Sequence, residues 1–185
     1  MKTTHAGLCL AALFLTASAS AQENPTATKP SPEHQILAAD AGTWDATIKS
    51  FMGGPDSDPV VSKGVETNEV LMGGLWVLSR FEGSFGPGKF EGRGQFGYDP
   101  IKKKYVGTWI DSLSPNLSVL EGEYDPKTKT MTYKGEGVAP EGVKYTQRMV
   151  TTTKDDGSRV FTLYMKVGEA KDEAKFMEIT YTKRK

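Results

Sequence analysis

From Thr43 onward, short runs of β-branched, aromatic and other apolar residues alternate with Gly-, Pro- and Asp-containing turn segments. That spacing is typical of a strand meander that closes into a barrel or sandwich. Because the connections are too short for parallel crossovers, sequential neighbours must be antiparallel. We therefore expect an all-β fold, an antiparallel up-and-down barrel of about ten strands. The expected strands lie near residues 43–52, 61–71, 75–85, 89–98, 104–112, 117–124, 129–137, 143–153, 158–167 and 175–184.

One short N-terminal helix is expected before the strands, at residues 32–41. Ser31 is a suitable N-cap, Pro32 fits the first turn, and Gly42 can end the helix. Residues 22–31 are polar and contain prolines without apolar periodicity, which predicts a flexible linker. Residues 32–185 are then expected to form a single barrel domain, a reasonable size for one hydrophobic core.

The first 21 residues have the pattern of a secretory signal peptide. Lys2 precedes a short apolar stretch at residues 8–16, and Ala19-Ser20-Ala21 forms a small-residue cleavage site before Gln22. The stretch is far shorter than the ~20 residues of a membrane-spanning helix, so we expect no membrane span. The prediction is a periplasmic or extracellular protein.

Alternation assigns side chains to the two faces of each strand. Phe161, Leu163 and Met165 share one face and should point inward. In the fifth strand, Trp109 and Asp111 share a face, which leaves two interpretations open. Asp111 lies in the cavity, where a carboxylate is costly unless paired, or it lies at the rim in water. In the first case, a positive side chain across the barrel would pair with it; the candidates are Arg80 and Arg148.

Composition excludes several kinds of chemistry. The chain has 23 basic and 23 acidic residues and lacks a basic stripe, so we expect no nucleic-acid binding. Once the leader is removed, His34 is the one histidine and no cysteine remains. A zinc site or an axial haem ligand would need more of these side chains. We therefore expect no metal site and no cofactor.

Three functional classes are compatible with this sequence. The favoured one is a binding protein that holds a small apolar or amphipathic molecule inside the barrel. The alternative is an enzyme that uses carboxylates and tyrosines in the same cavity, such as Asp111, Glu121, Glu123 and Glu178. A third possibility is a filled barrel that acts through its surface. The proposed ligand-binding candidates are Trp109, Asp111, Arg80, Arg148, Tyr133 and Tyr181, in a cavity also lined by Phe161 and Met165.

Two segments carry a resemblance to a known family, Gly42-Thr43-Trp44 and residues 97–111, which read GYDPIKKKYVGTWID. At these motifs the chain resembles a bacterial secreted family known as domain of unknown function 1579, over about residues 32–184. That family has no settled activity. The Gly-x-Trp opening is also similar to that of lipocalins and other calycins. That resemblance implies that Trp44 seals one barrel end beneath a basic residue of the last strand, here Arg184 or Lys183.

Overall fold

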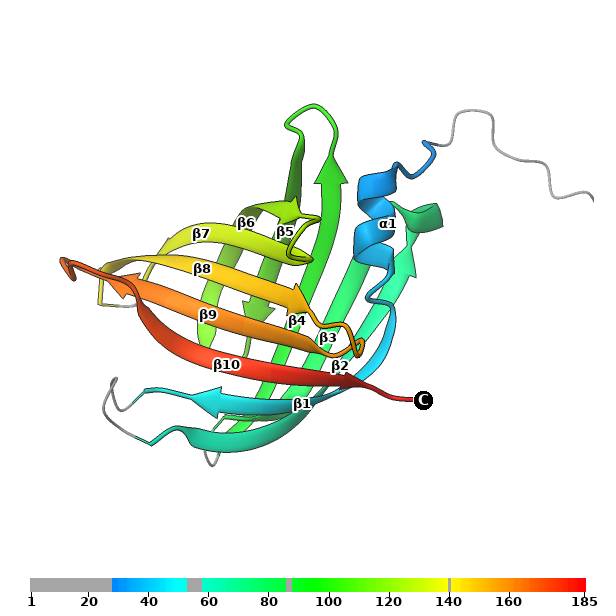
Figure 1. Cartoon of the computed structure of the whole chain (residues 1–185). Coiled ribbons are helices and arrows are strands. Elements are labelled where there is room, and N and C mark those ends of the chain that lie inside the picture. Colours follow the sequence, from blue (N-terminus) through cyan, green and yellow to red (C-terminus); the bar gives the residue numbers. More distant parts are fainter. Residues whose placement is uncertain (1–27, 53–57, 86–87, 140) are drawn as a thin grey trace, which may run out of the picture.

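The computed structural model describes residues 28–52, 58–85, 88–139 and 141–185. One helix, α1 (Pro32–Ala38), precedes ten strands that form a closed antiparallel barrel (Figure 1). Every strand has a neighbour on each side, so no strand is a free edge that would invite aggregation, although β6 and β7 pair only between residues 121–125 and 130–134. The strands are β1 (Gly42–Ser50), β2 (Val60–Leu71), β3 (Trp76–Phe85), β4 (Gly88–Asp99), β5 (Lys104–Asp111), β6 (Ser114–Asp125), β7 (Thr130–Val138), β8 (Lys144–Thr153), β9 (Arg159–Val167) and β10 (Ala174–Lys183).

This architecture confirms the predicted fold class, with ten strands in meander order and β1 paired with β10 to close the barrel. Two boundaries differ from expectation by three residues, and the other boundaries of the strands by at most two. Helix α1 ends at Ala38 rather than at residue 41, and β6 begins at Ser114 rather than at residue 117. Pro115 lies in this early part of β6, where the ladder to β5 is shifted between Trp109 and Asp111. A proline is tolerated there because the irregular pairing does not need its missing N–H.

Helix α1 packs beside β3 and β4 at one end of the barrel (Figure 1). Its residue Leu37 is buried in the core cluster with Val77, Tyr105 and Leu120. His34 is also buried; its Nδ1 accepts a hydrogen bond from the backbone N–H of Ser31, at 3.1 Å. Burial of Leu37 and His34 holds the helix against this end of the barrel.

Of the fully described connections, β5–β6 and β9–β10 lie at the opposite end of the barrel. In Figure 1 the β9–β10 connection lies on the far side of the barrel from α1. The helix within the described ranges is too short to cross a membrane. The predicted signal peptide, and the linker as far as residue 27, lie outside the described residues.

Candidate functional site

The barrel encloses a cavity of about 1110 Å³. It extends from Ile36 and Leu37 of α1 to Phe85 and Phe176 near the opposite end. Most of its lining side chains are aromatic or aliphatic, as in pockets for small molecules. The lining includes the predicted residues Trp109, Asp111, Tyr133, Tyr181, Phe161 and Met165.

Glycines on neighbouring strands determine how the aromatic rings lie along the cavity wall. Trp109 is directly opposite Gly94 in the β4–β5 ladder, and Tyr133 is directly opposite Gly122 in the β6–β7 ladder. A Cβ on Gly94 would lie 2.7 Å from Cε3 of Trp109, and one on Gly122 would lie 2.7 Å from Cδ1 of Tyr133. The rings therefore occupy the space that side chains would fill at these glycines, and they pack against the wall.

Trp109 and Asp111 lie together on the inner face of β5. Nε1 of Trp109 donates a hydrogen bond to Oδ2 of Asp111 at 3.0 Å, and the backbone N–H of Leu113 donates to Oδ1 at 2.9 Å. Asp111 is half-buried, at the end of the strand where the cavity meets the β5–β6 connection. It thus combines features of both interpretations: it lines the cavity, yet it stands near the rim, and its carboxylate is satisfied by neighbours on its own hairpin.

Arg80 and Arg148 do not reach the cavity, and the prediction that they could pair with Asp111 is wrong. The residues next to each arginine in its strand line the cavity, such as Phe81 after Arg80, so alternation turns both arginines outward. Arg80 pairs with Glu69 on the exterior, at 3.6 Å. Arg148 binds Glu173 there, with Nε 3.0 Å from Oε1.

Three of the carboxylates considered for catalysis also lie on the exterior. Glu121 pairs with Lys102, Glu123 with Lys104 and Glu178 with Lys175. They are separated from the cavity by the barrel wall, so these three cannot act together with the inward tyrosines.

Trp44 occupies the barrel end that the calycin resemblance implies, and the predicted Lys183 lies over its ring, but the nearest cation is Arg159 of β9. Its side chain is buried, and Nε1 donates a hydrogen bond to the backbone carbonyl of Asp40 at 2.9 Å. The guanidinium carbon of Arg159 lies 3.8 Å from the ring centroid, whereas Nζ of Lys183 lies 5.2 Å away. Arg184 is exposed and pairs with Asp45, at 2.6 Å, because alternation turns it away from the barrel end. The prediction that Arg184 seals Trp44 is therefore wrong.

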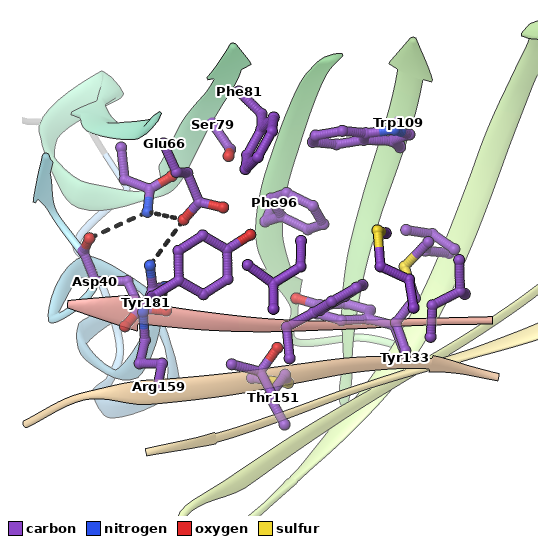
Figure 2. Close-up of a pocket in the computed structure, with 18 of the residues that line it drawn as sticks. Asp40, Glu66, Ser79, Phe81, Phe96, Trp109, Tyr133, Thr151, Arg159 and Tyr181 are labelled. Carbon is purple, nitrogen blue, oxygen red and sulfur yellow. Dashed lines mark hydrogen bonds and ion pairs between the residues drawn. The ribbon is translucent and has the colours of Figure 1, made fainter. Parts of the chain in front are cut away.

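Arg159 is the centre of a buried polar cluster at this end (Figure 2). Its guanidinium lies 2.9 Å from Oδ2 of Asp40 and 2.8 Å from Oε1 of Glu66. Nδ2 of Asn68 also donates to Oε1 of Glu66, at 2.8 Å. Burial raises the pKa of Asp40, and the nearby positive charge of Arg159 opposes that shift.

The sequence reasoning missed this cluster, although a local signal was present. Arg159 lies on the same face of β9 as Phe161 and Leu163, and Glu66 lies on the same face of β2 as Gly64 and Asn68. A charged residue on the strand face that otherwise carries core residues points inward and needs a partner. What the pattern could not show is that these strands meet across one barrel end.

Tyr133 and Tyr181 both face the cavity, from β7 and β10 (Figure 2). Burial raises the pKa of each phenol well above its usual range, and for Tyr181 the carboxylate of Glu66 adds to the effect. Both hydroxyls therefore stay protonated. That of Tyr181 is already hydrogen-bonded to Glu66, whereas that of Tyr133 has no partner among the described residues.

Within the described part of the chain, no group of three or more His, Cys, Asp or Glu side chains is arranged to hold a metal ion. The search of curated proteins finds no match to this chain. A comparison with protein families does find one, over residues 29–183, which include α1 and all ten strands. The chain belongs to the family described as "Protein of unknown function (DUF1579)".

Proposed function

We propose that this protein binds one small apolar or amphipathic molecule inside the barrel. The observation that carries the proposal is the cavity of about 1110 Å³, lined mainly by aromatic and aliphatic side chains. Ligand pockets of small-molecule binding proteins have volumes of roughly 300–1,000 Å³ and a similar apolar lining. Transfer of an apolar ligand from water to such a lining is favourable in proportion to the area that it buries.

The charged groups at the cavity support binding rather than acid–base chemistry. Asp40 and Glu66 are both held by Arg159, and Asp111 accepts hydrogen bonds from Trp109 and Leu113. A general acid or base must be free to exchange a proton with a substrate. These carboxylates instead stabilise the structure around the cavity.

Exposed apolar side chains at the barrel end opposite α1 offer a route for such a ligand. Val60 is 54% exposed and Leu113 is 60% exposed, and both flank connections at that end. An apolar rim is favourable for a water-insoluble molecule that moves toward an apolar interior. Others of this kind near that end are Met52, Val61, Val138, Val143 and Val167.

The proposal can be tested with the fluorescent probe N-phenyl-1-naphthylamine, whose emission rises in apolar surroundings. We expect saturable binding of one probe per chain. A Met149→Trp variant places a larger side chain in the cavity and should weaken binding at least tenfold, whereas Val150→Trp places the same indole on the outer face. Circular dichroism establishes that both variants fold. Lack of probe binding by the unmodified protein, or equal binding by both variants, would contradict the proposal.

We also propose that the protein acts outside the cytoplasm. The support is the leader pattern of residues 1–21. N-terminal sequencing of the folded protein from a secreting host should begin at Gln22, and a start at Met1 would overturn this proposal.

A further inference from the structure

Three buried polar atoms on residues that line the cavity lack hydrogen-bond partners among the described residues. One is Nε of Arg159, whose other nitrogens already pair with Asp40 and Glu66. The other two are on Tyr133 and Gln147. The hydroxyl of Tyr133 and the Nε2 atom of Gln147 are fully buried, and neither has a partner among the described residues. The two side chains are only 7% and 8% exposed. Because an unpaired buried polar group is costly, such groups in a native protein call for an explanation, and a bound ligand is one.

These two side chains are neighbours on the inner face of the β7–β8 pair. Tyr133 is opposite Met149, and Gln147 is opposite Gly135, so Tyr133 and Gln147 occupy diagonal positions. Diagonal positions are about 7–8 Å apart, within reach of long side chains. Gln147 lies over Gly135, where an added Cβ would lie 3.2 Å from Nε2 of Gln147 and 2.9 Å from Cδ2 of Leu120. Both side chains line the cavity from adjacent strands, which places the two donors on one stretch of its wall.

Both groups can donate a hydrogen bond to the same acceptor. The amide nitrogen of Gln147 carries two N–H bonds and cannot accept. Burial raises the pKa of Tyr133 far above its usual range, so its hydroxyl keeps its proton. The complementary ligand group is an oxygen with free lone pairs.

The surroundings indicate that this oxygen is uncharged. The cavity side chains next to the two donors are apolar, among them Leu120, Met131 and Met149. Arg159 is already bound by Asp40 and Glu66 at the α1 end. A carboxylate placed beside Tyr133 would lose its hydration without gaining a counter-ion, which is strongly unfavourable.

We propose that Tyr133 and Gln147 form the polar anchor of the cavity and that the ligand is a neutral amphiphile. Its carbonyl or hydroxyl oxygen accepts hydrogen bonds from both side chains. Its hydrocarbon part lies among the aromatic side chains. This inference rests on the proposed function and specifies its ligand class. Phe96, whose ring centroid is 5.4 Å from that of Tyr133, lies beside the proposed position of the head group.

The experiment measures displacement of N-phenyl-1-naphthylamine by 2-decanone and by decanoate at about pH 8, where the fatty acid is ionised. The proteins are the unmodified chain, Tyr133→Phe, Gln147→Met and Thr151→Val. Thr151 also lines the cavity from β8, so its variant removes a hydroxyl outside the anchor. We expect the unmodified protein to prefer 2-decanone. Tyr133→Phe and Gln147→Met should each weaken 2-decanone about three- to tenfold and leave the affinity for the dye within about twofold. Thr151→Val should change neither affinity.

Thermal denaturation without ligand provides the second readout. Loss of an unpaired polar atom should leave the melting temperature of Tyr133→Phe and Gln147→Met unchanged or raise it. A lower melting temperature would show that the atom has a partner within the protein and would overturn the anchor. Unchanged 2-decanone affinity in these two variants, or a preference of the unmodified protein for decanoate, would also overturn the anchor. If the dye still binds in that case, the proposed function stands. Failure of the dye to bind the unmodified protein would contradict both proposals.

Discussion

The guanidinium carbon of Arg159 lies 3.8 Å from the ring centroid of Trp44, so a cation from β9 covers the tryptophan of β1. The same guanidinium binds Asp40, just before β1, and Glu66 on β2. Stacking on the ring and pairing with two carboxylates use different parts of the arginine side chain. This one residue therefore connects the beginning of the barrel to its penultimate strand.

We expect Arg159→Met to destabilise the protein by about 3 kcal/mol, because it removes the arginine that pairs with the largely buried Glu66 and with the partly exposed Asp40. Urea unfolding measures the loss. Arg184→Met is the matched control, since Arg184 pairs with Asp45 on the surface and should contribute less than about 1 kcal/mol. Equal effects of the two substitutions would contradict the assignment of Arg159 as the residue that holds this barrel end.

A methyl group at Gly94 should disturb the aromatic wall of the cavity. Its Cβ would lie 2.7 Å from Trp109 and 2.8 Å from Phe96, so at least one ring must move. We expect Gly94→Ala to lower the free energy of unfolding by about 1–3 kcal/mol and to change the near-ultraviolet circular dichroism of the tryptophan. Gly88→Ala is the control, because its Cβ would meet its nearest atom at an ordinary 3.6 Å. A Gly94→Ala protein as stable as this control would show that the rings do not depend on the glycine.

The inward faces could be predicted because alternation is a local property of a strand. Phe161, Leu163 and Met165 were assigned to the interior correctly on that basis alone. Arg80 and Arg148 were chosen for their charge instead, although the same alternation places them outside. Attention to alternation would also have indicated Arg159.

The remaining features depend on contacts between strands that are distant in the sequence. Arg159 and Glu66 are 93 residues apart, and their pairing requires the barrel to close in the observed register. Local pattern does not contain that information. The unpaired state of Tyr133 and Gln147 likewise follows from the whole arrangement of the cavity.

Stability should fall as the pH rises above about 10. In the unfolded chain, tyrosines lose their protons near their ordinary pKa of about 10. Burial raises the pKa of Tyr105 to about 12, and it raises those of Tyr133 and Tyr181 as well. Above pH ~10 the folded state therefore binds more protons than the unfolded state, so the free energy of unfolding decreases with pH.

Urea unfolding between about pH 9 and pH 11 measures this dependence, and absorbance at about 295 nm follows tyrosinate formation. Tyr133→Phe removes one of the protons involved and should make the decline less steep. A free energy of unfolding that is constant over this range would contradict the burial of these phenols.

A crystal structure with 10-bromo-2-decanone would locate the ligand itself, because the anomalous scattering of bromine marks its position. We expect a bromine peak inside the barrel among the aromatic side chains, with the carbonyl oxygen within hydrogen-bond distance of Tyr133 and Gln147. A cavity filled by protein side chains, or bromine found only on the outer surface, would contradict the proposed function.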